Sequence, residues 1–112
     1  MKAVPQARLM RIHCGEDDRW EGRPLHEAIL EACRREEIER AVVYRGVEGY
    51  GASSLVHRPH WLRSSDLPIV ITIVDRREKL ERLLPAIEAM MGDGLIAISE
   101  VEAYRLEAKA RR

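Results

Sequence analysis

The sequence predicts an α+β domain whose elements follow one another in the order βαββαβ. Two stretches place apolar residues at helical spacing, and four stretches show the alternation or the apolar runs typical of strands. A connection of roughly 20 residues, about residues 45–66, separates the second strand from the third, where about 2–5 residues would be usual. We therefore expect a single domain over residues 1–112 with one long loop that is either functional or disordered.

The first strand is predicted over residues 7–14, where apolar and polar side chains alternate. Its apolar side is formed by Met10, Ile12 and Cys14. A polar loop follows, and Pro24 then suits the first turn of a helix because its missing N–H costs nothing there. The helix is predicted to run to about Glu37. Its apolar stripe has the spacing i, i+3, i+4, i+7 and i+8: Leu25, Ala28, Ile29, Ala32 and Cys33.

The second strand is short, about residues 40–44, and the third is predicted over residues 67–74. The third strand is apolar on both sides, with Ile69, Ile71 and Ile73 on one and Val70, Thr72 and Val74 on the other. A strand buried on both faces is central in its sheet, or its second face is covered by another subunit. Two helices cover only one face of such a sheet, so this pattern argues for an oligomer.

The second helix is predicted over about residues 76–91. Its stripe consists of Leu80, Leu83, Leu84, Ile87 and Met91. Pro85 lies inside this helix and should kink or break it, because the bond to the carbonyl four residues back is lost. Gly92, Asp93 and Gly94 are expected to end the helix in a tight turn.

The fourth strand begins at Leu95, and its alternation changes phase near Ser99, which suggests a bulge or a break. We expect it to continue to Leu106, between a loose start at residues 1–6 and a charged tail at residues 107–112. Two βαβ units in one short chain give the ferredoxin-like split arrangement. Its four-stranded antiparallel sheet carries both helices on one face.

Composition excludes several classes of function. Nineteen basic and nineteen acidic residues cancel, so no global field attracts the chain to nucleic acid or to a membrane surface. No apolar run approaches the roughly 20 residues that span a bilayer. The first residues lack the apolar core of a signal peptide, and we expect a cytoplasmic protein whose two cysteines, Cys14 and Cys33, are buried free thiols.

The long loop carries the residues best suited to chemistry. Gly46, Gly49 and Gly51 allow backbone N–H groups to approach an anion, and three arginines accompany a single glutamate over residues 45–65. Arginine suits phosphate, so a phosphate or nucleotide site fits this stretch. A flexible hinge fits its residues equally well.

Two other chemistries have weaker support. His57 and His60 could bind a metal together if the loop formed a turn, but no close set of three or four ligands accompanies them. The loop serines lack the glycine frame of a nucleophile elbow, and we therefore expect no enzyme.

The combined motifs resemble the PII-like family catalogued as domain of unknown function 190. They run over about residues 8–105 and include Gly15-Glu16…Asp18-Arg19-Trp20, Val43-Tyr44-Arg45-Gly46…Gly49-Tyr50-Gly51, Leu67-Pro68-Ile69-Val70 and Gly94-Leu95-Ile96. More distantly, Gly49-Tyr50-Gly51 is similar to the base of the T-loop of PII proteins, and Gly92-Asp93-Gly94-Leu95-Ile96 is similar to their B-loop. Arg105 falls near the C-terminal arginines that hold nucleotide phosphates in PII proteins.

This resemblance implies a regulatory homotrimer whose inter-subunit clefts bind a small anionic effector, such as an adenine nucleotide. The long loop becomes a T-loop that contacts a partner protein, for example a membrane transporter or an enzyme. The effector would be held by Arg45, Gly46, Gly49, Tyr50, Gly51, Gly92, Asp93, Gly94 and Arg105. This sequence departs from PII at Leu95, where PII has lysine, and the tyrosine that PII modifies has no clear counterpart.

Two alternatives remain from the same resemblance. One is a metal-binding trimer of the CutA type, with His57 and His60 as its candidate ligands. The other is an interaction protein that regulates a membrane transporter without any small effector.

Overall fold

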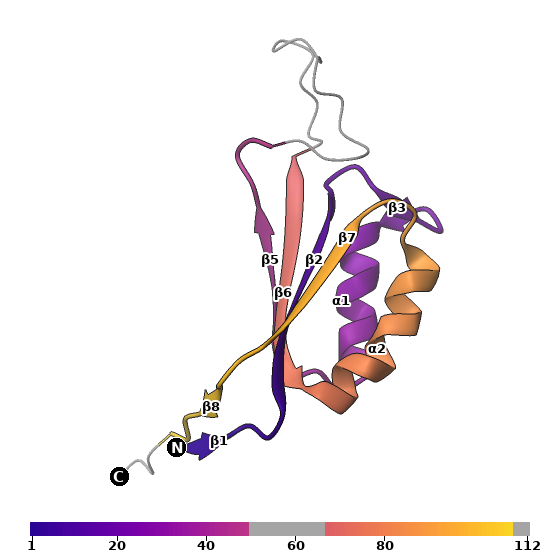
Figure 1. The fold of residues 1–112 in the computed structure, drawn as a ribbon. Helices are drawn as coiled ribbons and strands as arrows, with labels where there is room; N and C mark the ends of the chain where they lie inside the picture. The colour runs from indigo at the N-terminus through magenta and orange to yellow at the C-terminus, as the bar shows by residue number, and fades with distance from the viewer. Residues whose placement is uncertain (50–66, 109–112) are drawn as a thin grey trace.

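The computed structural model describes residues 1–49 and 67–108. Four strands form one antiparallel sheet in the order β5-β6-β2-β7, and helices α1 and α2 cover one of its faces (Figure 1). The predicted ferredoxin-like class is therefore confirmed. The bounds of these elements are β2 Ala7–Gly15, α1 Leu25–Arg35, β5 Ala41–Arg45, β6 Pro68–Arg76, α2 Arg77–Met90 and β7 Leu95–Glu100.

The sheet is organised around the pair β2 and β6. These strands run antiparallel over nine residues each, from Ala7 opposite Arg76 to Gly15 opposite Pro68. β5 pairs with the free side of β6, and β7 with the free side of β2. β6 is thus a central strand, as its apolar character on both sides predicted.

The core lies between this sheet and the two helices. The stripe of α1 is buried as predicted, and Ile69, Ile71 and Ile73 of β6 are 0–1% exposed. On α2 the buried residues are Leu80, Leu83, Ile87 and Met90. The predicted stripe of α2 is wrong in two places, because Leu84 and Met91 are only half-buried and Met90 faces the core instead.

The other face of the sheet is open and carries apolar side chains of β5 and β6. Val70, Thr72 and Val74 of β6 are half-buried there, whereas Val42 and Tyr44 of β5 are 46% and 58% exposed. Both helices lie on the opposite side (Figure 1). Within residues 1–49 and 67–108, no element packs on this face.

Pro85 does not interrupt α2, which runs unbroken from Arg77 to Met90. Both Pro85 and Glu81, whose carbonyl loses its helical partner, are exposed. Water can therefore satisfy that carbonyl, which lowers the cost of the missing bond. The predicted break at Pro85 is wrong.

Two short pairs of strands were not predicted from the sequence. β1 (Lys2–Ala3) pairs with β8 (Tyr104–Arg105) as a separate ribbon, so the predicted loose start is wrong. The change of phase near Ser99 marks a real break, after which the chain leaves the sheet for this ribbon. β3 (Arg19–Trp20) and β4 (Arg23–Pro24) form a hairpin, with Glu21 and Gly22 at φ 49° and 80° in its turn.

At the end of the sheet near the C-terminus of α1, a buried carboxylate links neighbouring segments of the chain. Asp75 is 7% exposed and accepts hydrogen bonds from the backbone N–H groups of Glu39, at 3.1 Å, and Arg76, at 2.7 Å. Lys79 lies 3.8 Å from the Asp75 carboxylate and donates to the Glu37 carbonyl at 2.8 Å. The connection from α1 to β5 is thereby attached to the start of α2.

Glu37 follows the end of α1 with φ of +59°. This left-handed conformation costs a non-glycine residue about 1–2 kcal/mol, and glycine is the usual residue at such a position. The Glu37 side chain is exposed, so its removal loses no packing.

We expect Glu37→Gly to raise the free energy of unfolding by about 0.5–1 kcal/mol, because relief of backbone strain exceeds the added entropy of the unfolded chain. Urea denaturation at fixed protein concentration measures this. Glu36→Gly is the matched control, since Glu36 has φ −88° and glycine there should destabilise. A Glu37→Gly protein that is less stable than wild type contradicts the strain argument.

Candidate functional site

The long loop leaves the sheet at one end, where several strand ends meet. β5 ends at Arg45, opposite Ile69, and β2 ends at Gly15, opposite Pro68. The backbone N–H of Gly46 donates to the Pro68 carbonyl at 2.7 Å, and that of Glu16 donates to the Leu67 carbonyl at 2.8 Å. The two stems of the loop are therefore tied to each other and to the end of β2.

Arg45 is ion-paired with Glu16 at this end of the sheet. The Arg45 side chain is 60% exposed, whereas that of Glu16 is only 15% exposed. A guanidinium has five N–H donors, more than one carboxylate can use. Arg45 therefore keeps donors for a ligand, but Glu16 competes for them, and the sequence analysis missed Glu16.

Two of the loop glycines pack closely on Pro68. A Cβ atom on Gly46 would lie 2.7 Å from Pro68 Cγ, and one on Gly49 would lie 3.1 Å from it. These glycines therefore allow a close approach of the two loop stems. The remaining predicted loop residues, Tyr50 and Gly51, lie outside the described residues.

The second glycine turn, Gly92 to Gly94, lies at the same end of the sheet but at its other edge. It leads from α2 into β7, where Leu95 stands opposite His13. Because β5 and β7 form the two edges, three strand spacings, about 14 Å, separate the turn from Arg45. A single small anion cannot contact both, whereas a ligand as extended as a nucleotide could.

Gly94 is confined by its neighbours. A Cβ atom there would lie 2.1 Å from Met91 Cε and 2.9 Å from the His13 carbonyl oxygen. Gly92, by contrast, has open space around the same position. Asp93 lines a cavity of about 190 Å³. Asp18, in the loop after β2, and Arg19 of β3 line it as well.

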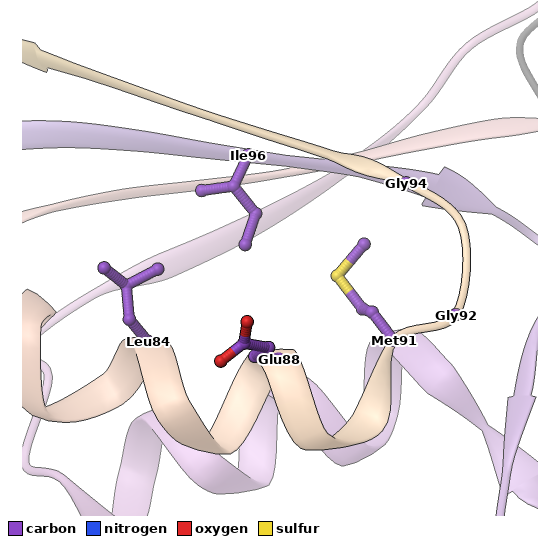
Figure 2. A pocket seen from close by; sticks show the side chains of 6 residues that line it. All are labelled: Leu84, Glu88, Met91, Gly92, Gly94 and Ile96. Carbon is purple, nitrogen blue, oxygen red and sulfur yellow. The ribbon is translucent and has the colours of Figure 1, made fainter.

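A larger cavity of about 350 Å³ lies between α2 and β7, next to the turn (Figure 2). Its lining is mainly apolar and contains one carboxylate. The lining residues are Leu84, Glu88, Met91, Gly92, Gly94 and Ile96.

Arg105 lies at the opposite end of the sheet. β7 runs from Leu95, opposite His13, to Glu100, opposite Arg8, and β8 follows beyond that point (Figure 1). Arg105 pairs there with Glu39. One chain therefore brings Arg45, Gly46, Gly49 and the glycine turn to a common end, and it does not bring Arg105 to them.

The described residues contain no group of three side chains that could hold a metal ion, and His57 and His60 lie outside them. Cys14 and Cys33 are free thiols, as predicted. Burial raises the pKa of both to about 11, with a further contribution from Asp18 at Cys14. Both thiols thus stay protonated and unreactive near neutral pH. In the described part of the chain, neither helix is long and apolar enough to cross a bilayer.

Comparison with known proteins identifies relatives over most of the chain. The family model described as "Uncharacterized ACR", domain of unknown function 190, matches residues 7–103. The UPF0166 protein of Aquifex aeolicus is 37% identical over 105 residues, which are 92% of this chain and 98% of that protein. The UPF0166 protein of Methanocaldococcus jannaschii is 33% identical over 103 residues, 91% of this chain and 95% of that protein.

Solved structures with the same fold are PII-like. A Thermus thermophilus protein described as PII-like and signalling has a TM-score of 0.64 at 16% identity, with 93% of this chain and 94% of that chain covered. CPII of Thiomonas intermedia, solved with ADP and bicarbonate, has a TM-score of 0.63 at 18% identity, with 93% of each chain covered. These likenesses show that the chain has the fold of PII-like signalling proteins.

The two glycines of the turn should respond differently to an added methyl group. We expect Gly94→Ala to lower the free energy of unfolding by about 1–3 kcal/mol, because the His13 carbonyl is backbone and cannot easily move away. Gly92→Ala is the matched control and should change stability little, since its Cβ meets nothing within 4 Å. Denaturation curves measure both, and equal stability of the two variants contradicts the packing described for Gly94.

Proposed function

The chain belongs to the "Uncharacterized ACR" family, domain of unknown function 190, and we propose that it is a PII-like regulatory protein without catalytic turnover. It binds a small anionic effector of the adenine-nucleotide class in clefts between the subunits of a homotrimer. Effector binding changes how the long loop meets a partner protein, such as a membrane transporter or an enzyme.

The observation that carries this proposal is the distribution of the candidate residues within one chain. Arg45 and the glycine turn share one end of the sheet, about 14 Å apart by strand spacing, and Arg105 lies beyond the other end. Arg105 can join them only from a neighbouring copy. A site between subunits accounts for all of these residues, whereas a site inside one chain leaves Arg105 out.

The open face of the sheet supports an assembly. Exposed or half-buried apolar side chains from three strands lie on it, among them Val42, Tyr44, Val70 and Leu95. Burial of such a face against other copies removes apolar area from water, at about 25 cal/mol per Å². In a closed cyclic assembly each copy presents two different surfaces to its neighbours, and these form the clefts.

The arginines of the proposed site already pair with carboxylates. They therefore favour an anionic ligand that can share or take the place of these carboxylates. Arg45 is paired with Glu16 and Arg105 with Glu39. A phosphate group can accept from a guanidinium in the same bidentate way as a carboxylate. Effector phosphates would share or replace these partners, so binding includes a rearrangement of both ion pairs. The ADP and bicarbonate bound to CPII make an adenine nucleotide the first ligand to test.

Calorimetry against ATP, ADP, AMP, cyclic AMP and bicarbonate tests the effector class. We expect at least one nucleotide to bind, and Arg45→Ala to weaken it by about tenfold or more, because a charge-assisted hydrogen bond contributes about 1.5–3 kcal/mol. Arg35→Ala is the matched control, since Arg35 is an exposed arginine of α1 paired with Glu31. Absence of binding by every ligand overturns the effector proposal, and a partner that co-purifies in ligand-free buffer then favours the effector-independent alternative.

Mixed assemblies test whether the site is shared between copies. We expect Arg45→Ala and Arg105→Ala proteins each to bind the effector poorly. After unfolding, equal mixing and refolding, about a quarter of the clefts in a cyclic trimer should combine the native Arg45 of one copy with the native Arg105 of the next. Calorimetry of the mixture should recover that fraction of tight sites. Recovery of none shows that Arg45 and Arg105 do not act across an interface.

Substitutions at two adjacent residues of β6 distinguish an effect on folding from an effect on assembly. Ile71 is fully buried in the core, and Thr72 lies on the open face. We expect Ile71→Asp to abolish folding, because an unpaired buried carboxylate is very costly. Thr72→Asp should instead leave a folded monomer, as measured by light scattering and circular dichroism against a wild-type trimer of 12.9 kDa subunits. A Thr72→Asp protein that remains trimeric contradicts the role of this face.

A further inference from the structure

The cavity between α2 and β7 shares Gly92 and Gly94 with the effector site proposed above, and its other lining residues are not part of that site. Leu84 and Met91 of α2 and Ile96 of β7 form its walls, and the glycine turn closes one end (Figure 2). Its volume of about 350 Å³ lies at the lower end of the range of about 300–1,000 Å³ typical of small-molecule sites. It can therefore accept only a small ligand.

The polar group of this cavity is the carboxylate of Glu88, an exposed residue that lies between Leu84 and Met91 on α2 (Figure 2). Most other carboxylates on the helices have cationic partners: Arg76 pairs with Glu78, Arg77 with Glu81, and both Arg23 and Arg35 with Glu31. In the described part of the chain, no arginine or lysine forms an ion pair with Glu88. The cavity thus combines an unpaired negative charge with apolar walls.

This combination defines the ligand that the cavity would recognise. An anion would be repelled by Glu88, and an ion hydrated on all sides would lose water against Leu84 and Ile96. A positive group on a short apolar chain satisfies both parts, because the carboxylate accepts its hydrogen bonds while the chain contacts the walls. The thioether of Met91 adapts to differently shaped ligands.

We propose that this cavity is a second ligand site, which binds a small organic cation that carries an amine or guanidine group on a short apolar chain. Glu88 holds the cationic group, and Leu84, Met91 and Ile96 contact the apolar part. Its charge preference is opposite to that of the effector site.

Met91 connects this site to the glycine turn. Its Cε atom lies against Gly94, so closely that a Cβ on that glycine would be 2.1 Å from it. A ligand that moves the Met91 side chain therefore acts directly on residues 92–94. We expect occupation of the cavity to change the conformation of the turn even when no effector is bound.

Titration with n-butylguanidinium, followed by amide NMR shifts of the full chain, tests this site. We expect saturable shifts concentrated at Glu88, Met91, Gly92, Gly94 and Ile96. The neutral isostere n-butylurea should bind about tenfold more weakly or worse, because it lacks the charge-assisted bond to the carboxylate.

Three variants distinguish specific binding from general association. Glu88→Gln should weaken n-butylguanidinium by about tenfold or more, and Glu27→Gln, at an exposed glutamate of α1, should leave it unchanged. Leu84→Trp should also abolish binding by filling the cavity. The proposal is overturned by equal affinity for n-butylurea, by an unchanged affinity in Glu88→Gln, or by shifts that do not saturate.

A second measurement tests the coupling, and this part rests on the proposed effector site. If n-butylguanidinium changes the affinity for a nucleotide, the nucleotide must change the affinity for n-butylguanidinium by the same factor. Calorimetry in both orders measures the two factors, and we expect both to differ from one. Equal affinities with and without the cation refute the coupling. Absence of any nucleotide binding refutes the effector site, while the NMR titration still decides the cavity.

Discussion

The pairing of β2 with β6 is the constraint on which the rest of the structure depends. Ile12 stands opposite Ile71, and both are fully buried. Because side chains alternate along a strand, a shift of one residue would turn this whole set toward the open face. The register also fixes where each strand ends. It places the stems of the long loop at one end of the sheet and the β1–β8 ribbon beyond the other end.

The same register separates the predicted binding residues. Arg45 and Gly94 lie at one end but on opposite edge strands, and Arg105 follows β7 beyond the far end. A single copy therefore keeps the three parts of the proposed site apart. In the trimer proposed above, assembly through the open face unites them, so the apolar side chains of that face and the polar residues of the proposed site would depend on each other.

The helices and strands with a regular pattern of apolar residues could be predicted from the sequence. The stripe of α1 was predicted correctly because burial on one side sets its spacing, and the central place of β6 because its side chains are apolar on both sides. The β1–β8 ribbon and the Asp75 network could not be found in this way, since both join residues far apart in the chain. Met90 was missed because its neighbour Met91 continues the same spacing. Glu16 was missed because its ion-pair partner, Arg45, lies at the end of another strand, β5.

Charge pairing links the two proposed sites. The chain has no net charge, and in its described part several exposed arginines pair with nearby carboxylates, as Arg45 does with Glu16 and Arg105 with Glu39. Recognition of a charged ligand then depends on whether the ligand can share or displace the ion-pair partners of individual side chains, because there is no strong overall field to attract it. Glu88 differs from these carboxylates because its charge meets an apolar cavity instead of an arginine. In these proposals a cation at Glu88 completes a missing pair, whereas an anion at Arg45 shares or replaces the existing partner, Glu16.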